Sequence, residues 1–355
     1  MVSASKHQIF TSTLLHWNSI ENTRSMPWKW EKDPYKIWLS EIILQQTRVD
    51  QGLSYYNRFV EKYPNIGQLA SAPEQEIFKL WEGLGYYSRC RNLIHTAKVI
   101  AGKPSRNFPD TYKGLLELKG IGPYTAAAIA SFAFNRPHAV LDGNVSRLLA
   151  RFFCIHTAID SPDGKKEMEL LANTLLEKND PAAYNQAIMD FGALICKPRQ
   201  PLCEQCLLRP YCCAFNKNLV QQLPYKASRI EKKHRWFYYF LLQKGEQIML
   251  LQRSKKDIWQ NLYEFPMVEE VKSAHLKRLM KSKQVKELLG YDVNVVHLSP
   301  DYKQQLTHQT IHGYFSKLEV KYFPNIPGAI IVEKSSLIKY AFPRMLRQYI
   351  QDFPL

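Results

Sequence analysis

The sequence predicts two domains, an all-α domain followed by an α+β domain. Helical periodicity dominates the first 215 residues, whereas short β-like runs appear after residue 235. The segment between them, 216–234, is polar and basic, contains Pro224 and has no sustained period. We therefore expect a helical domain over 1–215, a linker over 216–234 and a second domain over 235–355.

The periodicity also predicts where the elements lie. Helices are expected in the first domain at 8–17, 35–47, 51–62, 74–81, 88–100, 112–118, 124–134, 145–153 and 165–177. The second of these follows Asp33-Pro34, an N-capping acid with proline at the first helical position. In the second domain, strands are expected at 236–243, 247–252, 311–317 and 330–332, with a helix near 276–289.

The chain is strongly basic, with 48 Lys+Arg against 32 Asp+Glu and a net charge of +16. Most of the excess is in the second part, because residues 1–215 carry 25 basic and 20 acidic residues and residues 216–355 carry 23 and 12. This excess favours a polyanionic partner, most often nucleic acid, although a basic protein without such a partner has the same composition.

No apolar run approaches the ~20 residues of a membrane span, so no membrane partner is expected. Residues 1–10 lack the charged start and apolar core of a secretory signal. The seven cysteines are mostly clustered. Together these features predict a protein of a reducing interior such as the cytoplasm.

Four cysteines lie in one proline-rich loop with the spacing C-x6-C-x2-C-x5-C: Cys196, Cys203, Cys206 and Cys212. So many soft ligands in a short loop favour a metal centre over disulfides. A zinc ribbon usually has two C-x2-C pairs and this loop has one, so a [4Fe–4S] cluster is favoured over zinc. Cys213 directly follows Cys212, and the spacing leaves open which of the two is the fourth ligand.

A Gly-x-Gly turn joins two predicted helices in the segment Leu-Lys-Gly-Ile-Gly-Pro-Tyr-Thr-Ala, residues 118–126. Gly120 and Gly122 are able to take positive φ and to expose backbone N–H groups, and the next helix adds free N–H donors. Such a turn binds phosphate without reading sequence, as a DNA-backbone contact does. A plain tight turn is the alternative.

These motifs, in this order, resemble the helix-hairpin-helix DNA glycosylase superfamily. The segment 141–145 (Leu-Asp-Gly-Asn-Val) is part of this superfamily pattern. The segments 40–47 (Ser-Glu-Ile-Ile-Leu-Gln-Gln-Thr), preceded by Pro27-Trp28, 81–87 (Trp-Glu-Gly-Leu-Gly-Tyr-Tyr) and 185–187 (Asn-Gln-Ala) resemble one branch, the MutY adenine DNA glycosylases. The match runs from about residue 10 to 212. It implies a [4Fe–4S] cluster on the four cysteines. It also implies a cytoplasmic, nucleoid-associated bacterial monomer whose partner is double-stranded DNA with A:8-oxoguanine or A:G mispairs.

Glu41 lies in an apolar stretch of predicted helix, on the face of Ile37 and Leu44. Its carboxyl is either turned to solvent or partly buried with a raised pKa, and only the second state makes a general acid near neutral pH. By resemblance, Glu41 is the catalytic acid that protonates adenine N7 and later helps to activate water.

Asp142 precedes an amphipathic helix, and its position is typical of an N-cap. By resemblance it is also the second catalytic carboxylate, which stabilises the cationic sugar much as the carboxyl pair of a glycosidase does. Tyr124 stands where strand-nicking members of the superfamily carry a nucleophilic lysine. The resemblance therefore implies a reaction that stops at base removal.

The resemblance also assigns substrate contacts in the first domain. Trp28 and Gln186 fall in the adenine pocket, where they would stack on the flipped base and pair with its N6/N7 edge. Gln46 and Tyr86 fall at the wedge that fills the gap in the duplex. The alternative for Trp28 is a core tryptophan. For Gln186, Gln46 and Tyr86 it is an ordinary helix or loop position.

Two segments of the second domain, 261–266 (Asn-Leu-Tyr-Glu-Phe-Pro) and 305–309 (Gln-Leu-Thr-His-Gln), resemble a Nudix (MutT-like) domain that recognises 8-oxoguanine. Leu306, Thr307 and His308 would contact the oxidised base, with a plain β-turn as the alternative. The region after Glu269 lacks the carboxylate series with which a Nudix hydrolase holds Mg²⁺, so no pyrophosphohydrolase activity is expected.

Two other functions share part of these features. An endonuclease III-like glycosylase and lyase would need a lysine in place of Tyr124. A non-catalytic iron–sulfur protein that binds DNA or senses redox state would leave Glu41 and Asp142 without a role. The sequence therefore favours a monofunctional adenine glycosylase that acts at A opposite 8-oxoguanine.

Overall fold

The structure is a computed structural model that describes residues 4–227, 232–290 and 294–353. The chain forms two compact units, one of residues 1–71 and 95–229 and the other of residues 72–94 and 230–355. Residues 1–3, which belong to the segment tested for a secretory signal, and residues 228–231 of the predicted linker lie outside the described residues. No described helix is long and apolar enough to cross a bilayer.

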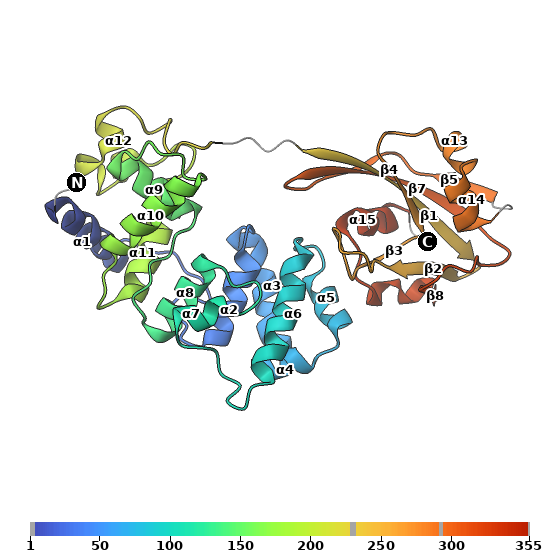
Figure 1. Cartoon of the computed structure of the whole chain (residues 1–355), viewed down its shortest axis with the longest axis horizontal. Helices are drawn as coiled ribbons and strands as arrows, with labels where there is room; N and C mark the ends of the chain where they lie inside the picture. Colours follow the sequence, from blue (N-terminus) through green and yellow to red (C-terminus); the bar gives the residue numbers. More distant parts are fainter. Residues whose placement is uncertain (1–3, 228–231, 291–293, 354–355) are drawn as a thin grey trace. The chain divides into compact units, whose positions relative to one another are not determined.

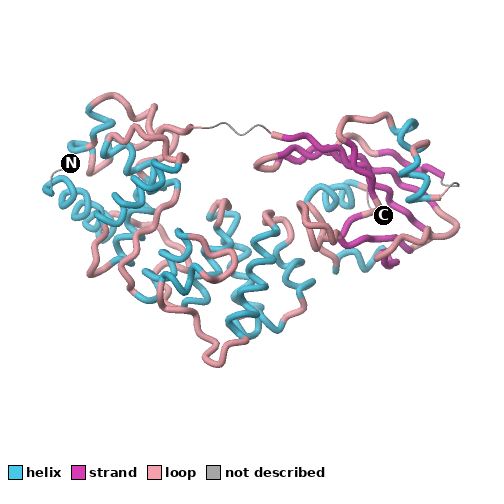
Figure 2. The backbone as a smooth tube through the Cα atoms, in the orientation of Figure 1, coloured by secondary structure: helices cyan, strands magenta, loops and turns pink. Residues whose placement is uncertain are grey.

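The first unit is helical (Figures 1 and 2). Its helices are α1 (Ala4–Ile20), α2 (Pro34–Leu44), α3 (Val49–Lys62), α4 (Ile66–Ser71), α7 (Tyr112–Leu116), α8 (Pro123–Phe134), α9 (Gly143–Phe153), α10 (Pro162–Leu175), α11 (Pro181–Leu194) and α12 (Cys213–Asn216), together with the end of α6 (Tyr87–Ala101). The helices predicted from periodicity are all present, whereas α4, α11 and α12 are not evident from it. Asp33 caps α2 as predicted, because its side chain accepts from the N–H of Tyr35 at 2.9 Å.

Helix α2 is shorter than predicted. It ends at Leu44 instead of continuing to residue 47, and Gln46 takes a left-handed backbone conformation with φ of 55°. This conformation is sterically costly for a residue with a Cβ and cannot continue a right-handed helix. Gln46 therefore lies on a turn after the helix.

The core of the helical unit joins α1 to α9, α10 and α11. Phe10 and Trp17 of α1 pack against Phe152 of α9 and Phe191 of α11. Helix α11 approaches the first turn of α9 so closely that a Cβ on Gly192 would lie 2.9 Å from the carbonyl oxygen of Asn144. Only glycine permits this approach, which fixes α11 against the start of α9.

The second unit is built on an eight-stranded sheet (Figures 1 and 2). Its strands are β1 (Lys233–Lys244), β2 (Gln247–Gln252), β3 (Tyr263–Glu264), β4 (Met267–Glu270), β5 (Asn294–Leu298), β6 (Tyr302–Gln305), β7 (Gln309–Glu319) and β8 (Ala329–Glu333). Strand β1 is central and pairs parallel with β7 and antiparallel with β2 and β4. The four predicted strands correspond to β1, β2, β7 and β8, while the short strands between them lack a periodicity that could be read.

Helices cover both faces of this sheet. Alternate side chains of β1 point to opposite faces, so each face contributes to a core. Tyr238 and Phe240 share a cluster with residues of α13 (Leu276–Met280) and α14 (Lys283–Leu289). On the other face, Phe315 stacks on Tyr349 of α15 (Arg344–Asp352) at 4.1 Å. The single helix predicted over 276–289 is wrong, because Ser282 interrupts it and caps α14 through the N–H of Val285.

Helix α5 (Glu74–Trp81) and the loop after it pack on the sheet within the second unit. Lys79 Nζ donates to the carbonyl of Tyr340 at 2.9 Å, and the N–H of Phe342 donates to Glu82 Oε1 at 2.8 Å. Arg91 of α6 donates to the carbonyl of Gln260 at 3.0 Å. Tyr86, between α5 and α6, is thereby held in the same unit as the sheet.

Candidate active site

The helical unit contains a cavity of about 490 Å³. The sequence-predicted residues that line it are Trp28, Glu41, Gln46, Tyr124, Asp142 and Gln186. They come from α2 and the turn after it, from α8 and α11, from the N-cap position of α9 and from the irregular segment after α1. The volume is within the usual range for a small-molecule site and is large enough for a nucleoside.

Glu41 is buried in α2, with 8% of its surface exposed. Burial raises the pKa of its carboxyl from 4.5 to about 7; the hydrogen bond from Tyr124 opposes this rise, and the charge of Asp142 adds to it. Of the two states that the sequence leaves open, the structure therefore has the buried one. A carboxyl with a pKa near 7 is able to donate a proton at neutral pH.

Tyr124 is the second residue of α8, and its hydroxyl lies between two acceptors. It hydrogen-bonds to Glu41 and lies 3.3 Å from Met189 Sδ. The carboxylate is the stronger acceptor of the two. Burial raises the pKa of Tyr124 well above 10, and the charges of Glu41 and Asp142 raise it further. The phenol therefore keeps its proton and acts as a donor.

Asp142 is the N-cap of α9, as predicted. One carboxylate oxygen accepts from the N–H of Val145 at 2.7 Å, and the other accepts from Asn144 Nδ2 at 2.8 Å. These two bonds fix the carboxylate at the N-terminus of α9, where the unpaired N–H groups of the first turn favour an anion.

Arg147, which the sequence analysis did not single out, secures the turn that carries Asp142. Its buried guanidinium donates to Asn144 Oδ1 at 2.9 Å and to the carbonyls of Gly192 and Cys196, both at 2.7 Å. One side chain thus joins the start of α9, the end of α11 and the cysteine loop. The available signal was a pair of arginines, Arg147 and Arg151, four residues apart in a helix whose other residues after Ser146 are all apolar.

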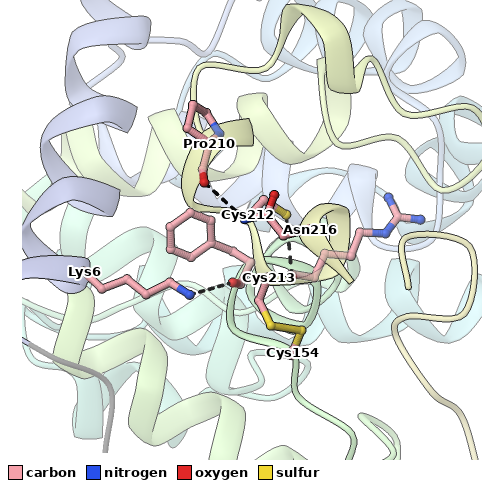
Figure 3. Close-up of a disulfide and its surroundings, with 8 residues drawn as sticks. Lys6, Cys154, Pro210, Cys212, Cys213 and Asn216 are labelled. Carbon is pink, nitrogen blue, oxygen red and sulfur yellow. Dashed lines mark hydrogen bonds between the residues drawn. A yellow bond between two sulfur atoms is a disulfide. The ribbon is translucent and has the colours of Figure 1, made fainter. Parts of the chain in front are cut away.

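The four cysteines of the predicted cluster line a second cavity in the helical unit, bounded also by Arg151. They are free thiols, whereas Cys213 is bonded to Cys154, with 5.5 Å between their Cα atoms. Figure 3 shows this disulfide beside Cys212, whose Sγ lies 3.7 Å from the carbonyl of Arg151. The structure therefore places Cys212, and not Cys213, with the other three.

The four thiols line one cavity, and Cys thiolates are the ligands of a [4Fe–4S] cluster, so the residues present fit that group. Within the described ranges, no group of three or more His, Cys, Asp or Glu side chains is placed to hold a metal ion. Burial raises the pKa of Cys206 to about 12.

The Gly-x-Gly turn differs in one respect from the prediction. Gly120 has φ of 85°, as expected, but Gly122 has φ of −91° and extended backbone. Gly122 is the N-cap of α8, and that position takes extended dihedrals. A Cβ at Gly122 would meet no heavy atom within 4 Å, so the space beside it is open.

The two predicted wedge residues share an unusual backbone. Gln46 in the first unit and Tyr86 in the second are exposed and have φ of 55° and 48°. Left-handed conformations of residues with side chains cost free energy and concentrate at functional sites. Tyr86 also contacts a predicted recognition residue of its own unit, because its hydroxyl lies 2.7 Å from Thr307 Oγ1.

Leu306, Thr307 and His308 form the loop of the β6–β7 hairpin. The N–H of Leu306 donates to the carbonyl of Gln309 at 2.8 Å, which closes the loop, and the N–H of Lys233 donates to the carbonyl of His308 at 3.0 Å. The side chains of Thr307 and His308 are exposed. The segment is therefore a turn whose polar side chains remain available to a ligand.

Trp28, which lines the first cavity, meets the ring of Tyr56 edge-on, with 5.1 Å between the ring centroids. Gln186 donates to Asp190, one turn later on α11, at 2.9 Å. Asp190, which is not among the residues predicted from the sequence, is fully buried beside Arg24 and Lys29. Its four-residue spacing from Gln186 was a usable signal, whereas the two cations come from an irregular segment.

Two family models match the chain in the order of its units. Residues 39–178 match the HhH-GPD superfamily of base excision DNA repair proteins, and residues 238–352 match the NUDIX domain. Among solved structures, a thermostable thymine-DNA glycosylase has a TM-score of 0.56 and 31% identity, covering 60% of this chain and 98% of that one. A trapped endonuclease III–DNA covalent intermediate has a TM-score of 0.52 over 62% of this chain and 100% of that one; at 21% identity it shows the fold alone.

The curated relatives are adenine DNA glycosylases. That of Buchnera aphidicola subsp. Baizongia pistaciae is 34% identical over 311 residues, which cover 86% of this chain and 84% of the relative. That of Homo sapiens is 32% identical over 323 residues, which cover 76% of this chain and 59% of the relative. Together with the helix-hairpin-helix unit and the Nudix-like unit, these matches show that the chain belongs to the adenine DNA glycosylase family, DNA-binding hydrolases of base excision repair.

Proposed function

We propose that this enzyme removes adenine paired with 8-oxoguanine or guanine in duplex DNA and leaves an abasic site. The observation that carries the proposal is the buried Glu41. Its pKa is near 7, and it shares one cavity with Tyr124, Asp142 and Gln186. An acid of that pKa beside a helix-capping carboxylate suits the departure of a base that must be protonated first.

In the first step, adenine leaves the duplex and enters the cavity, where Trp28 stacks on it and Gln186 pairs with its edge. Protonated Glu41 gives its proton to adenine N7. The bond between C1′ and N9 then breaks, and its electron pair leaves with the base. The sugar becomes an oxocarbenium ion, whose positive charge the carboxylate of Asp142 stabilises.

In the second step, water adds to C1′ and restores a neutral sugar. Glu41, now ionised, takes the proton of that water and returns to its acid form, as in glycoside hydrolysis. The hydrogen bond from Tyr124 favours Glu41 while it is ionised. Because Tyr124 is a phenol and not an amine, no Schiff base forms and the strand stays intact.

The remaining predicted residues would contact the duplex beside the flipped base. Gln46 and Tyr86 would act as the wedge, and both have left-handed backbones. The open space beside Gly122 would admit a phosphate to the N–H groups at the start of α8. Leu306, Thr307 and His308 would read the oxidised guanine, with Tyr86 bonded to Thr307.

We propose that Cys196, Cys203, Cys206 and Cys212 hold a [4Fe–4S] cluster. When bound, the cluster would cross-link a loop that has little regular structure of its own. That loop carries Lys197 and Arg199, two cations suited to phosphate contacts. Arg147 and Arg151 bind its first residues to α9 through the carbonyls of Cys196 and Lys197.

The reaction type is tested on defined duplexes. We expect adenine release from A:8-oxoguanine duplexes, with strand breaks only after heating in alkali. Borohydride should trap little or no protein–DNA adduct, because residue 124 is not a lysine. Matched duplexes with thymine glycol in place of adenine serve as the control for an endonuclease III-like activity. Efficient trapping, or strand breaks without alkali, would contradict the proposal.

Recognition of 8-oxoguanine is tested at the β6–β7 loop. The double substitution of Thr307→Ala and His308→Ala should reduce the ratio of single-turnover rates on A:8-oxoguanine and A:G duplexes by about five-fold or more, because polar contacts to the oxidised base are lost. Thr307→Ser keeps the hydroxyl bonded to Tyr86 and should keep most of the ratio. The salt concentration is held constant, because phosphate binding depends on it. An unchanged ratio in the double variant would refute this role.

The cluster is tested by iron content and colour. Protein purified without oxidation should be yellow-brown and contain about four irons per chain. Cys203→Ser or Cys206→Ser should abolish the colour and weaken DNA binding. Cys90→Ala, which removes a buried thiol outside the loop, should keep both. Stoichiometric zinc without iron in the native protein would overturn the assignment.

A further inference from the structure

We propose that Asp190 sets the base specificity of the cavity. By engaging the amide nitrogen of Gln186, it presents the carbonyl oxygen of that amide to the flipped base. The cavity then accepts a purine with an amino group at position 6 and rejects a purine with a keto group there. This inference rests on the proposed function, because it concerns the base that Glu41 protonates.

Asp190 lies on α11, one turn after Gln186, and none of its surface is exposed. Its Oδ1 accepts from Arg24 Nη1 at 2.7 Å. Its Oδ2 accepts from Gln186 Nε2 and Asn22 Nδ2, both at 2.9 Å, and lies 3.4 Å from Lys29 Nζ. The carboxylate thus meets two cations and two side-chain amides.

This environment determines which way the Gln186 amide points. Asp190 forms ion pairs with an arginine and a lysine, and a carboxylate in an ion pair has only acceptor sites. Gln186 must therefore turn its NH₂ group toward Asp190. The reversed amide would set Gln186 Oε1 against Asp190 Oδ2, two acceptors without a proton between them, at a buried site where such a mismatch is costly.

The oriented amide distinguishes between bases. Gln186 lines the cavity, and with its nitrogen engaged by Asp190 its carbonyl oxygen is the acceptor left for a ligand. Adenine offers the N6 amino group as a donor to that oxygen. Hypoxanthine has the same ring shape but offers O6, a second acceptor. A site built to hydrogen-bond one group rejects the mismatched group strongly.

The test compares release of adenine and hypoxanthine from otherwise identical duplexes opposite 8-oxoguanine, as a ratio of single-turnover rates. Asp190→Asn allows the Gln186 amide to reverse, and Gln186→Met removes the amide while keeping the length of the side chain. Both variants should lower the adenine-to-hypoxanthine ratio at least about ten-fold. Asp190→Asn should also release hypoxanthine faster than Gln186→Met does, because the reversed amide donates to O6.

The ratio cancels any general loss of folded protein or of DNA binding. Arg24→Met is the matched control, because it removes one cation from Asp190 but leaves the bond to Gln186; it should keep the wild-type ratio whatever its rate. If Asp190→Asn fails to fold, the adenine-to-hypoxanthine ratio of Gln186→Met still tests whether the Gln186 amide sets the base specificity. A wild-type ratio in the folded variants would overturn this inference alone. Absence of adenine release by the wild type would instead refute the proposed function.

Discussion

Replacement of Glu41 by glutamine is expected to lower single-turnover adenine release by at least ~10², because the amide has no acidic proton for adenine N7. The pKa of Glu41 is about 7. The wild-type rate should therefore fall as the pH rises above about 7, whereas the residual rate of the variant should not follow that titration. The measurement is the single-turnover rate on an A:8-oxoguanine duplex between about pH 5 and pH 9.

The same substitution should stabilise the protein at alkaline pH. The pKa of Glu41 is raised from 4.5 to about 7 on folding, so the native state retains a proton that the unfolded state loses between these values. The stability of the wild type therefore decreases across this window, by about 3 kcal/mol in total, and stays lowered above it. Glu41→Gln should unfold at a higher temperature than the wild type at pH 8 and at a similar temperature near pH 5.

Glu61→Gln, which changes an exposed carboxylate of α3, is the matched control and should alter neither the rate nor the pH dependence of stability. Full activity of Glu41→Gln would refute the proposed mechanism. A loss of activity without the gain in stability at pH 8 would show that Glu41 is not the buried acid described here.

The second large effect is expected for Asp142→Asn, which should also lower adenine release by at least ~10². The amide carries no charge to stabilise the oxocarbenium ion. Asparagine is a good N-cap, so helix α9 should still begin at Gly143, at a cost in unfolding free energy below about 2 kcal/mol. Rate and stability are measured together, by single turnover and by urea unfolding.

The matched control is Asp180→Asn. Asp180 caps α11 through the N–H of Ala183 at 3.1 Å and does not line the cavity. Its replacement should leave both the rate and the stability close to those of the wild type. If the two N-cap variants lost activity equally, the loss at Asp142 would reflect helix capping and not a charge in the active site.

The sequence alone determined the features whose signals are local. Periodicity located the helices, Asp33-Pro34 marked the start of α2, and Asp142 was identified as an N-cap. The resemblance to a glycosylase branch named six residues that line one cavity, and the cysteine spacing named the four thiols that line another. Each of these signals depends only on a few neighbouring residues or on a motif with a fixed order. It can therefore be recognised from the sequence alone.

The tertiary structure decided what depends on distant parts of the chain. Whether Glu41 is buried could not be read from its helix, because burial depends on how the rest of the chain packs around it. Tyr124 and Asp142, which also shift its pKa, lie far along the sequence. Cys213 was separated from Cys212 by its bond to Cys154, the residue that follows α9. Asp190 acquired its role from Arg24 and Lys29, about 160 residues away. Burial, charge pairing and amide orientation depend on the residues that surround a group in space. Those neighbours come from distant parts of the sequence, so only the folded chain brings them together.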